Sequence, residues 1–144
     1  AHKQAIVSLV ERKSGYAILA KVSNKTSDMV SAAIISGLGS IRSSVKTITF
    51  DNGKEFAGHA QIDEALGSTT YFAEPYSSWQ RGSNENLNGL IRQYVPKKRA
   101  LSTVTEREIK MIQDRLNHRP RKRLGFKTPH EVFHALHKTV ALRT

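Results

Sequence analysis

Two acidic residues, Asp51 and Glu85, have sequence surroundings that would suit metal-dependent chemistry on phosphates. Carboxylates are hard oxygen ligands of the kind that Mg²⁺ and Mn²⁺ prefer. Two such ions about 4 Å apart clamp the attacking and leaving oxygens of a phosphoryl transfer. That task needs acids that converge from different elements, and two ions usually require a third acid. Acids at strand ends and on helices are also common on solvated surfaces, so the pair alone leaves both interpretations open.

A strand is predicted to position Asp51. Residues 45–49, Val-Lys-Thr-Ile-Thr, have strand character and lead through Phe50 directly into the acid. Asn52 and Gly53 follow, and they end the strand because both residues tolerate positive φ. We therefore expect Asp51 at the carboxyl end of a strand, where an open α/β sheet presents side chains for chemistry.

A helix that begins at Ser83 and Asn84 is predicted to position Glu85. Its apolar residues recur at i, i+3, i+4 and i+7 and define a buried face: Leu87, Leu90, Ile91 and Tyr94. Glu85, Asn88 and Arg92 fall together on the other side. The step from Glu85 to Arg92 is seven residues, about two helical turns, so both side chains point the same way.

The rest of the pattern predicts one α/β domain over residues 1–144. Residues 4–10 and 15–22 form an antiparallel hairpin. Strands and helices then alternate, which is typical of parallel α/β units: a helix over 26–38, a strand over 45–50, a helix over 56–66 and a strand over 69–73. Two capping boxes, Thr105–Glu108 and Thr128–Glu131, open two later helices.

The net charge of +11 is concentrated in the second half of the chain. Residues 1–72 carry eight Lys and Arg against six Asp and Glu, whereas residues 73–144 carry fifteen against six. A basic half favours a polyanionic partner, in particular nucleic acid, over a basic surface without a partner. The chain has no Cys, which excludes disulfides and thiolate metal sites. No segment has the apolar length of a membrane span or the pattern of a signal peptide.

Several separated motifs, in this order, resemble the DDE transposases of bacterial insertion sequences, in particular the insertion-sequence-thirty type. They are residues 10–14 (Val-Glu-Arg-Lys-Ser), 51–56 (Asp-Asn-Gly-Lys-Glu-Phe), 77–86 around Glu85, and 117–129. The spacing also matches, with 33 residues between Asp51 and Glu85 and six between Glu85 and Arg92. The likeness covers nearly the whole chain.

The resemblance implies an RNase-H-like fold, similar to a retroviral integrase core, in which a mixed five-stranded sheet is flanked by helices. It implies cleavage and strand transfer of DNA with two divalent metal ions, Mg²⁺ or Mn²⁺. Asp51 matches the second acid of the family and Glu85 the third, while Arg92 matches a basic residue that contacts phosphate or a DNA end. The implied partners are transposon ends, target DNA and further copies of the chain, in the bacterial cytoplasm near the nucleoid.

The chain departs from the family at the first acid, which should lie on the first strand of the sheet. The opening hairpin resembles the second and third strands. The only earlier acids are Glu11, in the hairpin turn, and Asp28, at a helix start. We therefore expect the first strand and its Asp upstream of Ala1, and we expect the fragment alone to lack full activity.

Residues near the two acids have alternative interpretations. Asn52 and Gly53 are first of all a turn. Glu55 fits the first turn of a helix better than a supplementary metal ligand. Trp79 either stacks on a DNA base or packs on the sheet. Asn88 hydrogen-bonds either to substrate or to Glu85.

Two basic runs are predicted to contact DNA phosphates rather than to form a merely solvated face: Lys97, Lys98 and Arg99, and Arg119, Arg121, Lys122 and Arg123. The His residues at 130, 134 and 137 have helical spacing, but without Cys or an H-E-x-x-H motif they favour solvation or proximity to DNA over zinc. The alternatives to a transposase core are a non-catalytic RNase-H-like DNA-binding module and a structural protein of a nucleoprotein particle.

Overall fold

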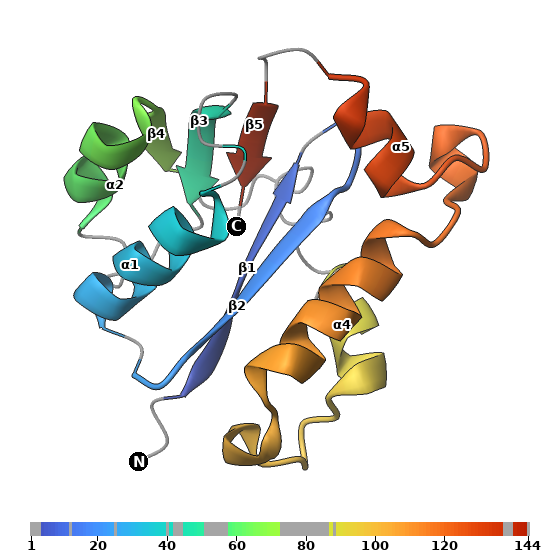
Figure 1. Cartoon of the computed structure of the whole chain (residues 1–144), viewed down its shortest axis with the longest axis horizontal. Coiled ribbons are helices and arrows are strands. Elements are labelled where there is room, and N and C mark those ends of the chain that lie inside the picture. The colour runs from blue at the N-terminus through green and yellow to red at the C-terminus, as the bar shows by residue number, and fades with distance from the viewer. Residues whose placement is uncertain are drawn as a thin grey trace.

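The computed structural model describes residues 4–11, 13–24, 26–39, 41, 45–50, 58–72, 87, 89–136 and 140–143. A mixed sheet forms the centre of the molecule, with helices on both of its faces (Figure 1). The predicted α/β architecture, a mixed sheet flanked by helices, is therefore confirmed.

The sheet has five strands in the order β2-β1-β5-β3-β4. β1 (Ala5–Glu11) and β2 (Ala17–Val22) form the predicted antiparallel hairpin, in which Ala5 lies opposite Val22 and Val10 opposite Ala17. β3 (Val45–Phe50) and β4 (Thr69–Phe72) pair in parallel, as the alternation of strands and helices predicted.

The central strand β5 (Val140–Arg143) comes from the C-terminal end of the chain and was not predicted. It runs antiparallel to β1 and parallel to β3, and an irregularity interrupts its pairing with β3 between Val45 and Thr47. Leu142, which is 1% exposed, belongs to the core. The C-terminal segment thus joins the hairpin to the parallel pair of strands.

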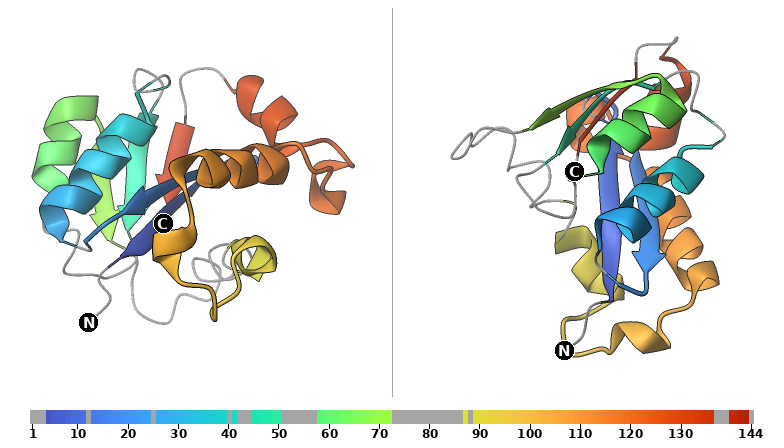
Figure 2. Two further views of the ribbon diagram at one scale, coloured as in Figure 1. Left: turned by 60° about the horizontal axis from the view of Figure 1, so that its bottom comes forward. Right: turned by 90° about the vertical axis from the view of Figure 1, so that its left-hand side faces the viewer.

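The two faces of the sheet bury separate hydrophobic clusters, because alternate strand residues point to opposite faces. Leu9 and Ile18 pack with α1 (Ser27–Gly37), α2 (His59–Leu66) and α5 (Pro129–His134). The next residues along the strands face α4 (Glu106–Asn117) and the helical residues 89–94. Figure 2 shows the sheet between these helices.

The helix boundaries follow local signals in the sequence. Thr26 caps α1 by accepting a hydrogen bond from the Met29 amide, and α2 ends at Gly67 in the left-handed conformation. The predicted capping box at Thr128 is complete. The one predicted at Thr105 is only half formed, because the Glu108 carboxylate pairs with Arg99 instead of reaching back to the cap.

None of the helices in the described ranges is long and apolar enough to cross a membrane.

The outer edge of β2 is covered by side chains of α4 and the segment before it. The Asn117 side chain accepts from the Ala17 amide at 2.7 Å and donates to the Ala17 carbonyl at 2.8 Å. Gln113, one turn earlier, accepts from the Leu19 amide at 2.9 Å, and Lys21 donates to the Val104 carbonyl. An edge strand normally exposes such groups, so α4 here replaces a neighbouring strand.

We expect Asn117→Ala to destabilise the protein by about 2–4 kcal/mol, because both polar groups of Ala17 would lose their partners in a buried place. Chemical denaturation measures the loss. Gln93→Ala, at an exposed helical position, is the matched control and should change stability little. Equal stability of the two variants would contradict this role of Asn117.

Candidate nucleic-acid interface and catalytic edge

The predicted catalytic residues lie outside the described ranges. This holds for Asp51 and Glu85, and for the predicted supporting or DNA-contacting residues Asn52, Gly53, Trp79, Asn84 and Asn88. Their roles stay predictions. The described parts of the chain nevertheless fix the strand end and the helix that flank them.

The strand that precedes Asp51 ends at a shared edge of the sheet. Phe50, the last residue of β3, lies opposite Phe72, the last residue of β4, and the two strands are parallel. Thr49 lies opposite Arg143 at the end of β5, which is also parallel to β3. Three carboxyl ends therefore meet at one edge, the place where open α/β sheets present functional groups.

The helix predicted to carry Glu85 has the expected apolar face. Leu87 and Ile91 are buried at 5% and 6% exposure, in the cluster that also contains Leu19 of β2. Leu90 and Tyr94 are partly buried against the same cluster, so the predicted set is confirmed. Arg92 is exposed. Packing of this face therefore holds residues 89–94 against the hairpin and leaves Arg92 accessible to a ligand.

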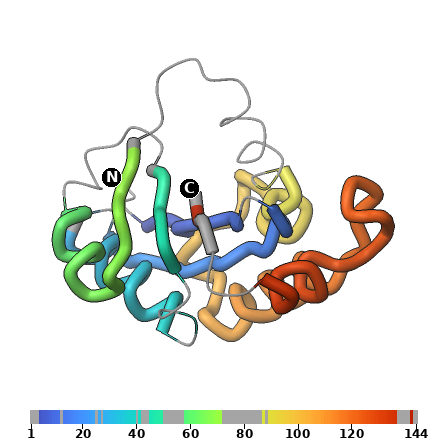
Figure 3. Tube along the Cα trace, turned by 90° about the horizontal axis from the view of Figure 1, so that it is seen from above, coloured from blue at the N-terminus to red at the C-terminus, as the bar shows by residue number. Residues whose placement is uncertain are grey.

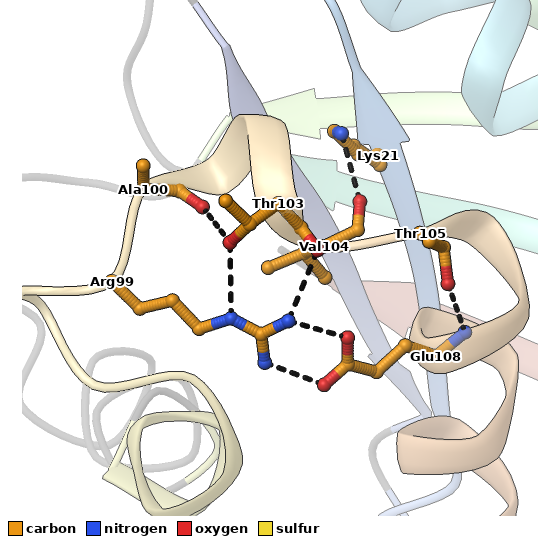
Figure 4. Close-up of polar contacts among 7 residues, drawn as sticks. All are labelled: Lys21, Arg99, Ala100, Thr103, Val104, Thr105 and Glu108. Carbon is orange, nitrogen blue, oxygen red and sulfur yellow. Dashed lines mark hydrogen bonds and ion pairs between the residues drawn. The ribbon is translucent and has the colours of Figure 1, made fainter.

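The first basic run divides into exposed and engaged side chains. Lys97 and Lys98 are exposed. The Arg99 guanidinium instead forms a bidentate ion pair with Glu108, with nitrogen–oxygen distances of 2.5 and 2.7 Å, and donates twice to Thr103 (Figure 4). Four of its hydrogen bonds are thus made within the chain, and Arg99 fixes the turn before α4.

Charge pairing changes the pKa values of both partners. The hydrogen bond from Arg99 lowers the pKa of Glu108, and the same bond raises the pKa of Arg99. The pair is therefore locally neutral at physiological pH. Contact between Arg99 and DNA stays a prediction, but the structural role shown here does not require it.

Glu108→Gln should lower the thermal midpoint at neutral pH by a few degrees at most, because the pair is partly exposed to solvent. Since the folded-state pKa of Glu108 is lowered, its contribution is present above the unfolded-state pKa and is lost as pH falls through the folded-state value. Thermal unfolding of both proteins should thus differ at pH 7 and converge in acid. A difference that persisted in acid would show that the ion pair is not its cause.

The second basic run lies in the loop between α4 and α5. Arg119, Lys122 and Arg123 are exposed, and Arg121 is half-buried. Desolvation lowers the pKa of Arg121, and the like charges of Arg119 and Arg123 lower it further. Among the described residues, no carboxylate forms an ion pair with these four side chains, so their charge is available to an anion.

Arg123 also anchors this loop to the turn of the hairpin. Its Nη1 donates to the Lys13 carbonyl at 3.3 Å. Gly15 has φ of +71°, and a Cβ placed on it would lie 2.6 Å from Nη2 of Arg123. The Arg123 guanidinium can pack against the hairpin turn because Gly15 has no side chain. This role of Gly15 was not predicted from the sequence.

The three described histidines near this loop pack on one another. The ring centroids of His118 and His130 lie 4.4 Å apart, and those of His130 and His134 lie 4.2 Å apart. Burial, then the neighbouring imidazoles, lower the pKa of His130. Within the described ranges no group of three or more His, Asp or Glu side chains could hold a metal ion, and His137 lies outside those ranges.

Comparison with solved structures identifies the class of fold. The catalytic core domain of BIV integrase matches with a TM-score of 0.68 and 24% identity, over 92% of this chain and 87% of that one. A simian T-cell lymphotropic virus intasome in complex with PP2A regulatory subunit B56 gamma matches with a TM-score of 0.66 and 16% identity, over 91% of this chain and 52% of that one. The chain therefore has the RNase-H-like fold of integrase catalytic cores.

The curated relatives are transposases of insertion sequences. The chain is 47% identical over 132 residues to the transposase for insertion sequence element IS4351 of Bacteroides fragilis. It is 45% identical over 128 residues to transposase InsI for IS30A of Escherichia coli (strain K12). These alignments cover 92% and 88% of this chain. The resemblance inferred from the motifs is thus confirmed: over most of its length the chain is a homologue of IS30-type insertion-sequence transposases.

The chain spans 40% and 33% of the lengths of these two relatives. No protein-family model matches it.

Proposed function

We propose that this chain is the catalytic core of a DNA transposase that cleaves DNA and transfers strands with divalent metal ions. The observation that carries the proposal is homology to insertion-sequence transposases on an integrase-core fold. The substrates are transposon ends and target DNA. The active form is a homo-oligomer of the longer protein.

Asp51 and Glu85 are the proposed ligands of Mg²⁺ or Mn²⁺. Their carboxylates supply the hard oxygen donors that these ions prefer. The sheet supports the assignment of Asp51, because β3 ends immediately before this residue at the edge shared with β4 and β5. When bound, two metal ions would stabilise the attacking and leaving oxygens of the phosphoryl transfer. Asn52 and Gly53 would turn the chain after Asp51, and Asn84 and Asn88 would support Glu85.

The first acid is proposed to come from outside residues 1–144. The two acids that precede Asp51 have other positions in the structure. Glu11 is 1% exposed, and its Oε1 accepts hydrogen bonds from the amides of Lys13 and Ser14 and from the Ser14 hydroxyl. Asp28 is exposed in the first turn of α1. Glu11 is the last residue of β1, opposite Leu142 of β5, and, contrary to the prediction, does not lie in the hairpin turn itself. Its carboxylate holds that turn, and Asp28 lies on a helix.

The proposed DNA surface consists of the cations at residues 92, 97 and 98 and those of the loop 119–123. Arg92 follows the proposed Glu85 position on the same helix, and Lys97 and Lys98 follow that helix directly. The basic loop 119–123 adds the second set of charges. Trp79 is retained as a proposed contact. Since Arg99 is paired with Glu108, its main proposed role is to stabilise the turn before α4, and DNA contact is a secondary role.

In the full-length transposase, we expect Asp51→Asn and Glu85→Gln each to abolish strand transfer while leaving DNA binding intact, because the amides bind divalent ions poorly. The assay joins labelled transposon-end DNA to a target plasmid in Mg²⁺. Glu64→Gln, at an exposed position of α2, is the control and should transfer normally. Normal transfer by the Asp51 variant would overturn the assignment.

The 144-residue chain alone should not nick DNA in Mg²⁺, because one acid of the proposed triad is absent from it. Robust turnover by the fragment would overturn the proposed missing acid. If the full-length protein binds DNA but neither cleaves nor transfers it, the non-catalytic DNA-binding module is the correct function. If neither activity nor DNA binding exists, a structural protein of a nucleoprotein particle is favoured.

The double change Lys97→Ala with Lys98→Ala should weaken DNA binding uniformly across sequences. If both lysines neutralise phosphates, the slope of log affinity against log salt should become shallower by roughly 1.8. Fluorescence anisotropy with a labelled duplex, measured over a salt series, checks this. Lys46→Ala with Lys110→Ala removes the same charge from exposed positions outside the proposed surface and should keep the original slope. Equal slopes for the two double variants would exclude a phosphate contact at residues 97 and 98.

A further inference from the structure

The loop between α4 and α5 presents an aromatic side chain to solvent. Phe126 is 70% exposed, and its φ of 68° lies in the left-handed region. Gly125 before it has φ of 64°, and a Cβ placed there would meet no atom within 4 Å. A bulky residue is rarely found in this conformation, because its Cβ approaches the backbone too closely. Strained residues persist where the surroundings hold them, and they gather at functional sites.

The backbone of the loop closes on itself and holds Phe126 in place. The Arg121 carbonyl accepts hydrogen bonds from the amides of Leu124 at 3.0 Å and Phe126 at 2.9 Å. The Arg121 amide donates to the Lys127 carbonyl at 3.0 Å. Arg123 fastens the same loop to the hairpin turn. Phe126 therefore lies on a closed loop that is docked on the hairpin turn. This loop lies at the end of the molecule opposite α2 (Figure 3).

The loop that carries the ring is rich in basic residues. Residues 115–130 contain six Lys and Arg and no Asp or Glu. Lys122, Arg123 and Lys127, which flank Phe126 in the loop, are all exposed. Nucleic acid offers phosphates to such cations and flat aromatic faces to such a ring, and every base has that face. An apolar protein surface would satisfy the ring but not the charges.

From this combination we propose that Phe126 stacks on an unpaired nucleobase of DNA whose phosphates are held by Lys122 and Lys127. The inference rests on the proposed DNA-binding function and adds a site to it. The strained backbone at residue 126 serves to aim the ring outward. The contact is tolerant of base identity, because a phenyl ring carries no hydrogen-bonding group with which to distinguish bases.

The test compares two DNA probes, a blunt duplex and the same duplex with a single-stranded extension that carries 2-aminopurine. Phe126→Ala should weaken binding of the extended probe by roughly tenfold and leave the salt slope unchanged, since stacking releases no counterions. It should also remove the change in 2-aminopurine fluorescence that stacking produces. Phe126→Trp should preserve both signals. Met111→Ala, which removes a 40% exposed apolar side chain from α4, is the matched control and should bind normally.

Phe126→Gly separates function from folding, because glycine adopts positive φ without strain. It should unfold at an equal or higher temperature than the wild type and still lose affinity for the extended probe. Unchanged affinity and fluorescence in Phe126→Ala, with salt-dependent binding intact, would overturn the stacking site alone. Loss of affinity only for the blunt duplex would overturn it in favour of insertion into paired DNA. Absence of any salt-dependent binding by the wild type would overturn the DNA-binding function together with this site.

Discussion

The contact between Asn117 and Ala17 determines how the two halves of the molecule meet. One side-chain amide satisfies both backbone groups of a residue on an edge strand, a hundred positions earlier in the chain. Because both distances are below 3 Å and the amide is 1% exposed, there is little freedom to slide α4 along β2. The basic loop begins two residues later, at Arg119. Its position relative to the sheet therefore depends on this contact and on the anchor at Arg123.

The central strand of the sheet, β5, comes from the C-terminal end of the chain. β5 pairs with β1 at Val10 and Glu11, near one end of that seven-residue strand, and it runs antiparallel to β1. A strand joined to the start of β1 by a tight turn would also be antiparallel to β1, so it would run in the direction that β5 has. The motif resemblance led us to expect a first strand outside this chain, and in the structure the C-terminal residues 140–143 occupy the centre of the sheet. The integrase-like fold is thus reached with a C-terminal strand in its middle.

Local signals made most of the architecture predictable, and long-range pairing accounts for the rest. The hairpin, the alternating units after it and the Thr128 capping box depend on neighbours in sequence, and all are confirmed. β5 has only four residues, too short for a clear pattern in the sequence, and it pairs with β1 and β3, which are distant in the sequence. Glu108 likewise satisfied the pattern of a capping box, but a guanidinium nine residues away competes better for its carboxylate.

The charges of the candidate site also could not be assigned from the sequence alone. Sequence placed seven cations in two basic runs as equivalent phosphate contacts, but their surroundings differ. Arg99 forms an ion pair with Glu108, and Arg123 donates a hydrogen bond to the hairpin turn. Arg121 is half-buried beside two like charges, an arrangement that costs stability unless an anion relieves it. A count of Lys and Arg predicts that a polyanion binds. The partners of each side chain in the structure show which of these cations are available to bind it. They are the exposed lysines and the cations of the loop that carries Phe126.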